Sequence, residues 1–367
     1  MDIKRYKAIH RLLILIIFLY SLLTNVNCNT FIRRSAKKQV RITVVGDIMF
    51  HSSQLVKYYN SKTKSYNAEE SFQWIRPKFV NSDLVMGNLE TTIVNHAELY
   101  GGYPRFGSPK EVVLALKNSG FHILSTANNH SADKGSHGID FTIDTVLDNE
   151  MIPLGTYKSE ADFRNRRNFM MNKNGINIAI YNYTYSTNGI KVPKGKIVRL
   201  IEEESLEKDI SFAKQNGANF VIVWFHFGTE YQTKPDAYQK KWVNRALELG
   251  ADVVIGGHPH VVQKLERVGD KFFAYSLGNF LSAQNKPFTD GGLVLHFDLI
   301  LSGNEKDITN ILPEAVWVDP SNYQIIPIDD ALEGKLEIKL SDSKMIRMKN
   351  YKKQYLNVIS DIEESKK

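Results

Sequence analysis

Six short apolar runs, each followed at once by polar residues, constrain the fold of this 367-residue chain more than any other feature. Within the runs, apolar residues follow one another without polar alternation, which is typical of strands that are buried on both faces. The runs are RITVV from residue 41, DLVMG from 83, HILST from 122, NFVIVWF from 219, ADVVI from 251 and KFFAYSL from 271.

Helical patterns lie between these runs, at residues 68–80, 108–120, 138–150, 202–217 and 235–250. Pro77 is expected to break or kink the first helix, and Ser108 is the expected N-cap of the second. The alternation of strands and helices predicts an α/β fold with mostly parallel central strands. The segment 264–300 has no helical pattern between its strands, so antiparallel pairing is expected there.

Polar clusters stand at the carboxyl ends of the six expected strands, the edge at which α/β sheets bind ligands. The clusters are Asp47, Asn88 with Glu90, Asn129 with His130, His226, His258 with His260, and Gly278 with Asn279. Taken singly, each has an ordinary explanation, such as a hydrogen-bonded core histidine or a turn aspartate. Their repetition favours one shared site, whereas His96, His122 and His137 are expected to be ordinary residues, with His137 in a glycine-rich turn.

The collected side chains suit a divalent metal. Neutral imidazoles and carboxylate oxygens are ligands of Zn, Mn and Fe, and the set is large enough for one or two ions. Two ions about 3.5–4 Å apart would share a carboxylate and activate a water molecule. Pro259 stiffens the link between His258 and His260, so both imidazoles are expected to address one site.

The order of the motifs resembles a known family. GD, NLE, ANNHSADKG, HFGTEY, GADVVIGGHPHVVQ and YSLGNF occur in the order found in the CapA or PgsA capsule biosynthesis proteins, which are associated with poly-γ-glutamate. That family belongs to the calcineurin-like metallophosphoesterase superfamily. The resemblance runs from about residue 41 to about residue 300, and it implies a metallophosphoesterase-like layered α/β sandwich.

The resemblance also implies roles for individual residues. Asp47 and His260 would be ligands of a first ion. Glu90 would bridge the two ions. Asn129, His226 and His258 would be ligands of the second ion. His130 would be a general acid that Asp133 orients. Arg105 is the candidate partner of an anionic substrate group, and Asn88 and Asn128 are further candidates for substrate contact.

The chain departs from the superfamily pattern in two positions. The usual Asp-x-His reads Asp47-Ile48-Met49 here, and the nearest histidine is His51. The bridging residue is Glu90 instead of Asp. CapA-like proteins share both features, which leave a two-ion site, a one-ion site and a non-catalytic site as alternatives.

The N-terminus predicts export. A basic start precedes the apolar run LLILIIFLYSLL, which suits the h-region of a signal sequence, and Cys28 follows in the position of a lipid-modified cysteine. An uncleaved anchor and ordinary cleavage are the alternatives. The expected parts are a leader (1–28), a linker (29–40), the metallophosphoesterase-type domain (41–301) and a C-terminal extension (302–367) that completes the domain and ends in a solvated or disordered charged tail.

Charge and context limit the partners. The net charge of +7 is modest and gathers at both ends of the chain, so a nucleic-acid groove is not expected. The expected partners are the membrane, through the N-terminus, an acidic polymer, and polymer synthase or export subunits. Three functions stay open: an envelope protein for making or exporting capsule poly-γ-glutamate, a metal-dependent hydrolase of phosphoesters or polymer amides, and a non-catalytic polymer-binding module.

Overall fold

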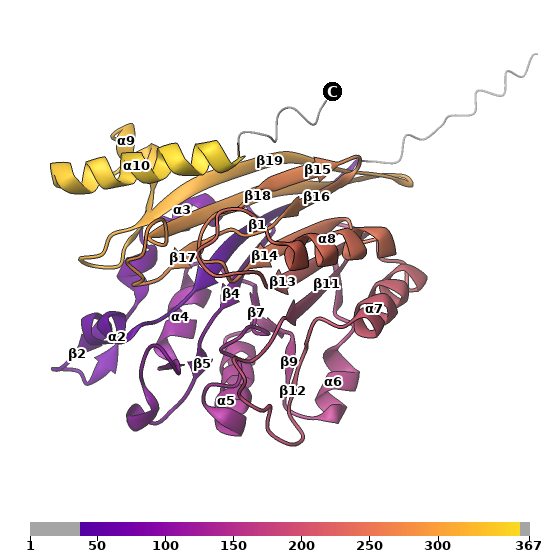
Figure 1. Cartoon of the computed structure of the whole chain (residues 1–367), viewed down its shortest axis with the longest axis horizontal. Helices are drawn as coiled ribbons and strands as arrows, with labels where there is room; N and C mark the ends of the chain where they lie inside the picture. The colour runs from indigo at the N-terminus through magenta and orange to yellow at the C-terminus, as the bar shows by residue number, and fades with distance from the viewer. Residues whose placement is uncertain (1–36, 360–367) are drawn as a thin grey trace, which may run out of the picture. The chain divides into compact units, whose positions relative to one another are not determined.

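The computed structural model describes residues 37–359, which form two β-sheets packed face to face between layers of helices (Figure 1). The predicted leader, Cys28 and the last eight residues lie outside the described residues. Among residues 37–359, no helix combines the length and apolar character that a membrane span requires. The expected layered α/β sandwich is therefore confirmed.

The first sheet joins parallel strands from the N-terminal half to antiparallel strands from the C-terminal part. In order across the sheet, its strands are β20 (Ile325–Pro327), β19 (Glu305–Val318), β18 (Gly291–Ser302), β1 (Lys38–Ile48), β4 (Leu84–Leu89), β7 (Ile123–Ser125) and β8 (Ile152–Leu154), and β17 (Asn279–Leu281) pairs with β1. Strands β1, β4, β7 and β8 run parallel, and β18, β19 and β20 pair antiparallel. The antiparallel later part of the prediction is thus confirmed.

The second sheet has a parallel centre and an antiparallel strand at each edge. Its order is β10 (Met170–Lys173), β11 (Ile176–Thr184), β13 (Phe220–His226), β14 (Val253–Gly257), β16 (Lys271–Ala274) and β15 (Leu265–Val268). Three short pairs complete the strands: β2 (Tyr59–Asn60) with β3 (Ser65–Tyr66), β5 (Thr92–Ile93) with β6 (Gly107–Ser108), and β9 (Thr156–Tyr157) with β12 (Ile197–Val198). Residues 176–184 form a strand that the sequence analysis did not predict.

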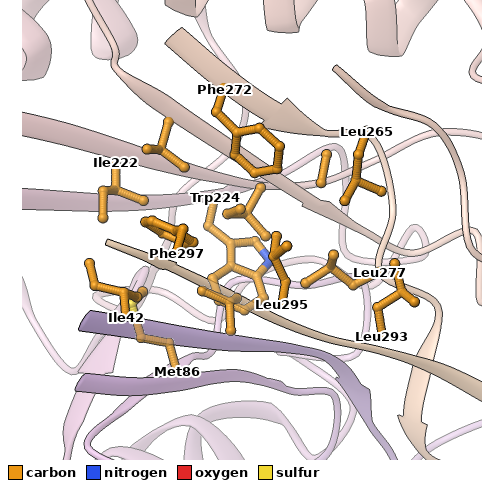
Figure 2. Close-up of a cluster of buried hydrophobic side chains, with 14 of the residues drawn as sticks. Ile42, Met86, Ile222, Trp224, Leu265, Phe272, Leu277, Leu293, Leu295 and Phe297 are labelled. Carbon is orange, nitrogen blue, oxygen red and sulfur yellow. The ribbon is translucent and has the colours of Figure 1, made fainter. Parts of the chain in front are cut away.

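Alternate side chains of each central strand enter different cores, which explains why the runs are apolar throughout. In β13, Ile222 and Trp224 point into the core between the two sheets, whereas Val223 packs under the outer helices. Figure 2 shows Trp224 surrounded by side chains of both sheets, including Ile42 of β1 and Phe272 of β16. The two sheets are therefore held together by one apolar layer.

Helices cover the outer faces of the sheets. The helical elements are α2 (Ser52–Tyr58), η1 (Glu69–Phe72), α3 (Arg76–Phe79), η2 (Ala97–Leu99), α4 (Glu111–Asn118), α5 (Gly135–Asp148), α6 (Glu160–Arg166), α7 (Glu203–Gln215), α8 (Ala237–Leu249), α9 (Ile328–Leu332) and α10 (Asp342–Ile359). Helix α4 packs on the first sheet, and α7 and α8 pack on the second. The helices predicted at 138–150, 202–217 and 235–250 are confirmed.

Two local predictions were wrong, and a third was only partly right. Ser108 is not an N-cap: it lies in β6, its hydroxyl bonds Thr91, and α4 begins at Glu111 after Lys110. The segment 68–80 is broken, as expected, into a short 3₁₀ helix and a single α-helical turn, but Pro77 lies inside that turn instead of at the break. His137 lies within α5 instead of a turn.

The C-terminal part is more ordered than predicted. Strand β19 is long and lies directly beside β18, so the first sheet continues past residue 301. Helix α10 is not a solvated helix within its described length, because Met348, Tyr351 and Tyr355 are buried against the sheet that contains β19 (Figure 1). Their spacing of three and four residues forms one apolar stripe, which the many lysines of the tail obscured.

Candidate metal centre

The carboxyl ends of parallel strands from both sheets meet at one edge of the molecule. Asp47 is near the end of β1, and Glu90 directly follows β4. His226 ends β13, and His258 and His260 directly follow β14. All five side chains are buried. The predicted convergence therefore occurs, but the ligands come from two sheets instead of one.

These five residues form two overlapping groups with the spacing of metal ligands. One group contains Glu90, His226 and His258, and the other contains Asp47, Glu90 and His260. Within each group the candidate ligand atoms all lie within 4.8 Å of one another. Glu90 belongs to both groups, the position that a bridging carboxylate between two ions requires. Asn129 extends the first group, because its Oδ1 lies 2.8 Å from His226 Nε2.

Asp47 is held in place by backbone and side-chain donors. Asn88 Nδ2 donates to Asp47 Oδ1 at 2.8 Å, and the backbone N–H of His258 donates to Oδ2 at 3.1 Å. Gly257 makes this approach feasible, because a Cβ at that position would lie 2.7 Å from Asp47 Oδ1. The second glycine of GGHPH is therefore explained by the carboxylate that lies against it.

The His258-Pro259-His260 segment has an unusual backbone. His258 has a φ of 96° and His260 has a φ of 59°, a region that residues other than glycine seldom adopt. Such conformations persist only where surrounding contacts enforce them, and they are common at functional sites. Here they turn both imidazoles toward the two carboxylates: His260 Nδ1 lies 3.2 Å from Asp47 Oδ2.

Two buried polar atoms at the centre have no hydrogen-bond partner among the described residues: Glu90 Oε1 and His258 Nδ1. Glu90 Oε1 lies 3.5 Å from His226 Nε2 and 3.9 Å from His260 Nε2. A buried carboxylate oxygen without a partner is costly, and a coordinated cation removes that cost. The nitrogen and oxygen donors at this spacing therefore fit one or two divalent ions of the Zn, Mn or Fe type.

Burial and mutual charge shift the pKa values of the ligands. Burial acts to raise the pKa of Asp47, but the hydrogen bond with His260 and the nearby His226 outweigh it and lower the pKa. Burial acts to lower the pKa of His260, but Glu90 and Asp47 raise it to about 9. Burial, together with His226 and His260, holds the pKa of His258 well below its ordinary value. The pocket thus favours a neutral imidazole at His258 and positive charge beside the two carboxylates.

His130 and Asp133 lie next to the ligand groups as a hydrogen-bonded pair. His130 Nδ1 is 2.7 Å from Asp133 Oδ2, and both side chains are almost fully buried. The same Asp133 oxygen accepts the backbone N–H of Phe106 at 2.7 Å, and the Phe106 ring meets the His130 ring edge-on at 4.7 Å. The imidazole is therefore fixed on two sides.

The three residues expected to contact substrate lie in different surroundings. Asn88 and Asn128 are buried, and Asn128 Nδ2 donates to Asn88 Oδ1 and to the Leu89 carbonyl. Through these contacts both amides hold the candidate ligands in position, so their geometry does not favour direct contact with a substrate. Arg105 is exposed and directly precedes Phe106, at the side of the site that holds His130.

Met49, the third residue of the sequence Asp47-Ile48-Met49, contacts Ser282 instead of the candidate ligands. Met49 is buried, and the Ser282 hydroxyl donates to its Sδ at 3.8 Å. The same hydroxyl lies 3.2 Å from His51 Nε2, so His51 reaches the edge of the site and is engaged there by Ser282. Burial, with His260 and His130 nearby, lowers the pKa of His51 to about 4.

Sequence reasoning missed three contributors to the site. Asn279 was noted at a strand end without a role, and its Oδ1 lies 3.1 Å from His260 Nδ1. Tyr185 follows the unpredicted strand β11, and its ring is 4.6 Å from that of His258. The ring of Tyr231 is 6.0 Å from that of His260. Tyr231 is the last residue of the motif HFGTEY, and this motif was the signal that could have identified it.

Fold and site together define a two-sheet α/β protein with a candidate divalent-metal centre at the carboxyl edge of its parallel strands. The family model described as "Bacterial capsule synthesis protein PGA_cap" matches residues 41–284. The chain belongs to this family, and the predicted relationship to CapA proteins is confirmed.

Curated relatives agree with this assignment. The capsule biosynthesis protein CapA of Bacillus anthracis is 27% identical over 347 residues, covering 86% of this chain and 81% of the relative. The PGA biosynthesis protein CapA of Bacillus subtilis is 28% identical over 312 residues, covering 82% and 80%. Among solved structures, the calcineurin-like phosphoesterase YfkN from Bacillus subtilis has a TM-score of 0.46 at 13% identity, covering 88% of this chain and 98% of that one. A likeness at that level carries no argument about the site.

Proposed function

We propose that the chain acts in the biosynthesis of a poly-γ-glutamate-type capsule as a metal-dependent hydrolase. Family membership and the names of the curated relatives support the capsule role. The metal-dependent chemistry rests on one observation: Glu90 is shared by two buried ligand groups, and its Oε1 has no partner among the described residues.

The residues divide into three roles in this proposal. Asp47, Glu90, His226, His258 and His260, with Asn129, hold the ions. When bound, divalent ions supply a water of lowered pKa and polarise the scissile group. His130 delivers a proton to the leaving atom from Nε2, because its Nδ1 faces Asp133. Arg105 pairs with an anionic group of the substrate.

The substrate class follows from these parts. Either a phosphoester or an amide bond of an acidic polymer suits a site that activates water and protonates a leaving group. A non-catalytic polymer-binding module is the second candidate, favoured by Met49 in the position of a usual ligand. Metal content and turnover distinguish the two.

The test uses the purified full chain, reconstituted with Mn or Zn and freed of excess metal. We expect at least one bound ion per chain, measured by elemental analysis, and hydrolysis of a phosphodiester or of poly-γ-glutamate. Glu90→Gln should lower the metal content, and the exposed Glu98→Gln serves as its control. A reconstituted wild type without metal contradicts the hydrolase proposal, and metal without turnover favours the binding module.

Location and partners are part of the same proposal. Export to the cell envelope, anchoring through Cys28 or the apolar N-terminus, and contact with polymer synthase or export subunits are proposed from the sequence. Cys28→Ser should abolish incorporation of a labelled fatty acid and release the protein from the membrane fraction. Unchanged labelling would remove Cys28 from this role.

A further inference from the structure

A cavity lies between α10 and the loop 282–290 that joins β17 to β18. Its volume is about 450 Å³, and its lining includes Lys286, Phe288, Ile346, Arg347 and Asn350. Ser343, Ile346, Arg347 and Asn350 recur at the spacing of one helix face, so the exposed side of α10 forms one wall. We call this cavity the α10 groove.

The groove combines positive charge with exposed apolar edges. Asp290 also lines it, but its Oδ2 already accepts from Arg347 Nε at 2.6 Å and from Trp317 Nε1 at 2.8 Å. Asp290 and Arg347 form an ion pair and largely neutralise each other, so Lys286 carries the positive charge that a ligand meets, and the outer guanidinium nitrogens of Arg347 offer hydrogen-bond donors. Phe288 and Ile346 are 42% and 59% exposed, and they offer contact for methylene groups.

Lys286 connects the groove to the metal centre. Its Nζ lies 3.7 Å from the centre of the Tyr231 ring, a cation–π distance, and the Tyr231 ring is 6.0 Å from that of His260. The loop is tied to the same ligand, because Asn279 Nδ2 donates to Gln284 Oε1 and to the Thr289 carbonyl while Asn279 Oδ1 faces His260. A chain-like ligand that leaves the metal centre past Tyr231 would thus meet Lys286 and then Arg347.

We infer that the α10 groove binds a carboxylate-bearing polymer and positions it along a path past Lys286 to the metal centre. This inference rests on the proposed function for the identity of the polymer. Repeated carboxylates match the succession of Lys286, Arg347 and the amide of Asn350, and the methylenes between carboxylates match Phe288 and Ile346. Several weak contacts along one chain add up to useful affinity, whereas a single glutamate gains little.

The test measures binding of a defined poly-γ-glutamate oligomer to the full chain by fluorescence anisotropy at low and physiological salt. Lys286→Gln and Arg347→Gln should each weaken binding about threefold, the size expected of an exposed ion pair, and Lys286→Glu should weaken it further. The matched controls are Lys349→Gln and Lys353→Gln, which remove exposed charges from the same helix outside the groove. Free glutamate should not compete at equal carboxylate concentration.

Equal losses in the groove variants and in the controls would overturn the inference, because they indicate attraction by net charge alone. Absence of oligomer binding to wild type at low salt would also overturn it. Lys286 is exposed, so its variants stay informative even if Arg347→Gln unfolds the loop. Metal content is measured on the same samples. His258→Ala should lose metal and keep oligomer binding, so failure of the groove and failure of the metal centre are distinguishable.

Discussion

At the residue scale, charge balance explains the candidate metal centre. Asp47 and Glu90 are both buried, and the candidate ligand atoms around them lie within 4.8 Å of one another in each group. Two buried carboxylates need compensating positive charge. The same two carboxylates stabilise the protonated form of His260 and raise its pKa to about 9. A divalent cation meets the same need and also engages Glu90 Oε1.

His130→Ala tests the role of general acid. Turnover should fall by about 100-fold or more, because a positioned acid contributes on that order, while metal content stays unchanged. The measurement pairs steady-state rates with elemental analysis. The exposed His122→Ala is the matched control. Unchanged turnover in His130→Ala would remove this residue from the mechanism.

Gly257→Ala tests how closely Asp47 is held. The new Cβ would lie 2.7 Å from Asp47 Oδ1, so the carboxylate must move. We expect a loss of metal affinity and a decrease of about 1–3 kcal/mol in the free energy of unfolding, as for other overpacked sites. Titration with Mn and urea unfolding provide the readouts. Gly101→Ala is the control, because an added Cβ there meets no atom of the described chain within 4 Å. Wild-type affinity in Gly257→Ala would contradict the assigned contact.

At the element scale, the ends of helices and strands determine where the ligands stand. Helix α8 begins with a capping box. Asp236 Oδ1 accepts the backbone N–H of Gln239 at 2.8 Å, and Gln239 Oε1 accepts the backbone N–H of Asp236 at 3.1 Å. The helix ends at Gly250, whose φ of 112° turns the chain toward β14. This geometry sets the start of the strand that carries His258 at its far end.

Asp236→Ala should lower the free energy of unfolding by about 1 kcal/mol, because the N-cap acceptor for Gln239 is lost. Asp236 also accepts the Thr229 hydroxyl at 2.8 Å, so the loop before α8 loses a second contact. Urea unfolding of the full chain measures the change, with the exposed Lys240→Ala on the same helix for comparison. A difference between the two variants below a few tenths of a kcal/mol would argue against the cap.

At the scale of the whole molecule, the candidate centre joins the two sheets. The first sheet supplies Asp47 and Glu90, and the second supplies His226, His258 and His260. The apolar layer around Trp224 fixes the distance between the sheets, so packing far from the ligands determines their spacing (Figure 2). An ion bound here would contact both sheets, and its binding site exists only in the folded protein.

Metal should therefore stabilise the whole chain. At a free metal concentration of about 100 times Kd, binding to the native state alone adds about 2.7 kcal/mol to the free energy of unfolding. The melting temperature should rise with Mn or Zn concentration and return to the ion-free value after chelation. His258→Ala should show little of this rise. An equal rise in His258→Ala would place the stabilising ion elsewhere.

The sequence by itself determined the α/β class, the central strands and the polar residues at their ends, because burial on both faces and strand-end chemistry leave local patterns. It did not reveal β11, whose asparagines and tyrosines interrupt the apolar run, or the buried stripe of α10, which lysines surround. Only the tertiary structure decided that the strands divide between two sheets and that His258 and His260 face Asp47 and Glu90. The physical reason is that these relations depend on packing between segments more than two hundred residues apart, and no local pattern records that packing.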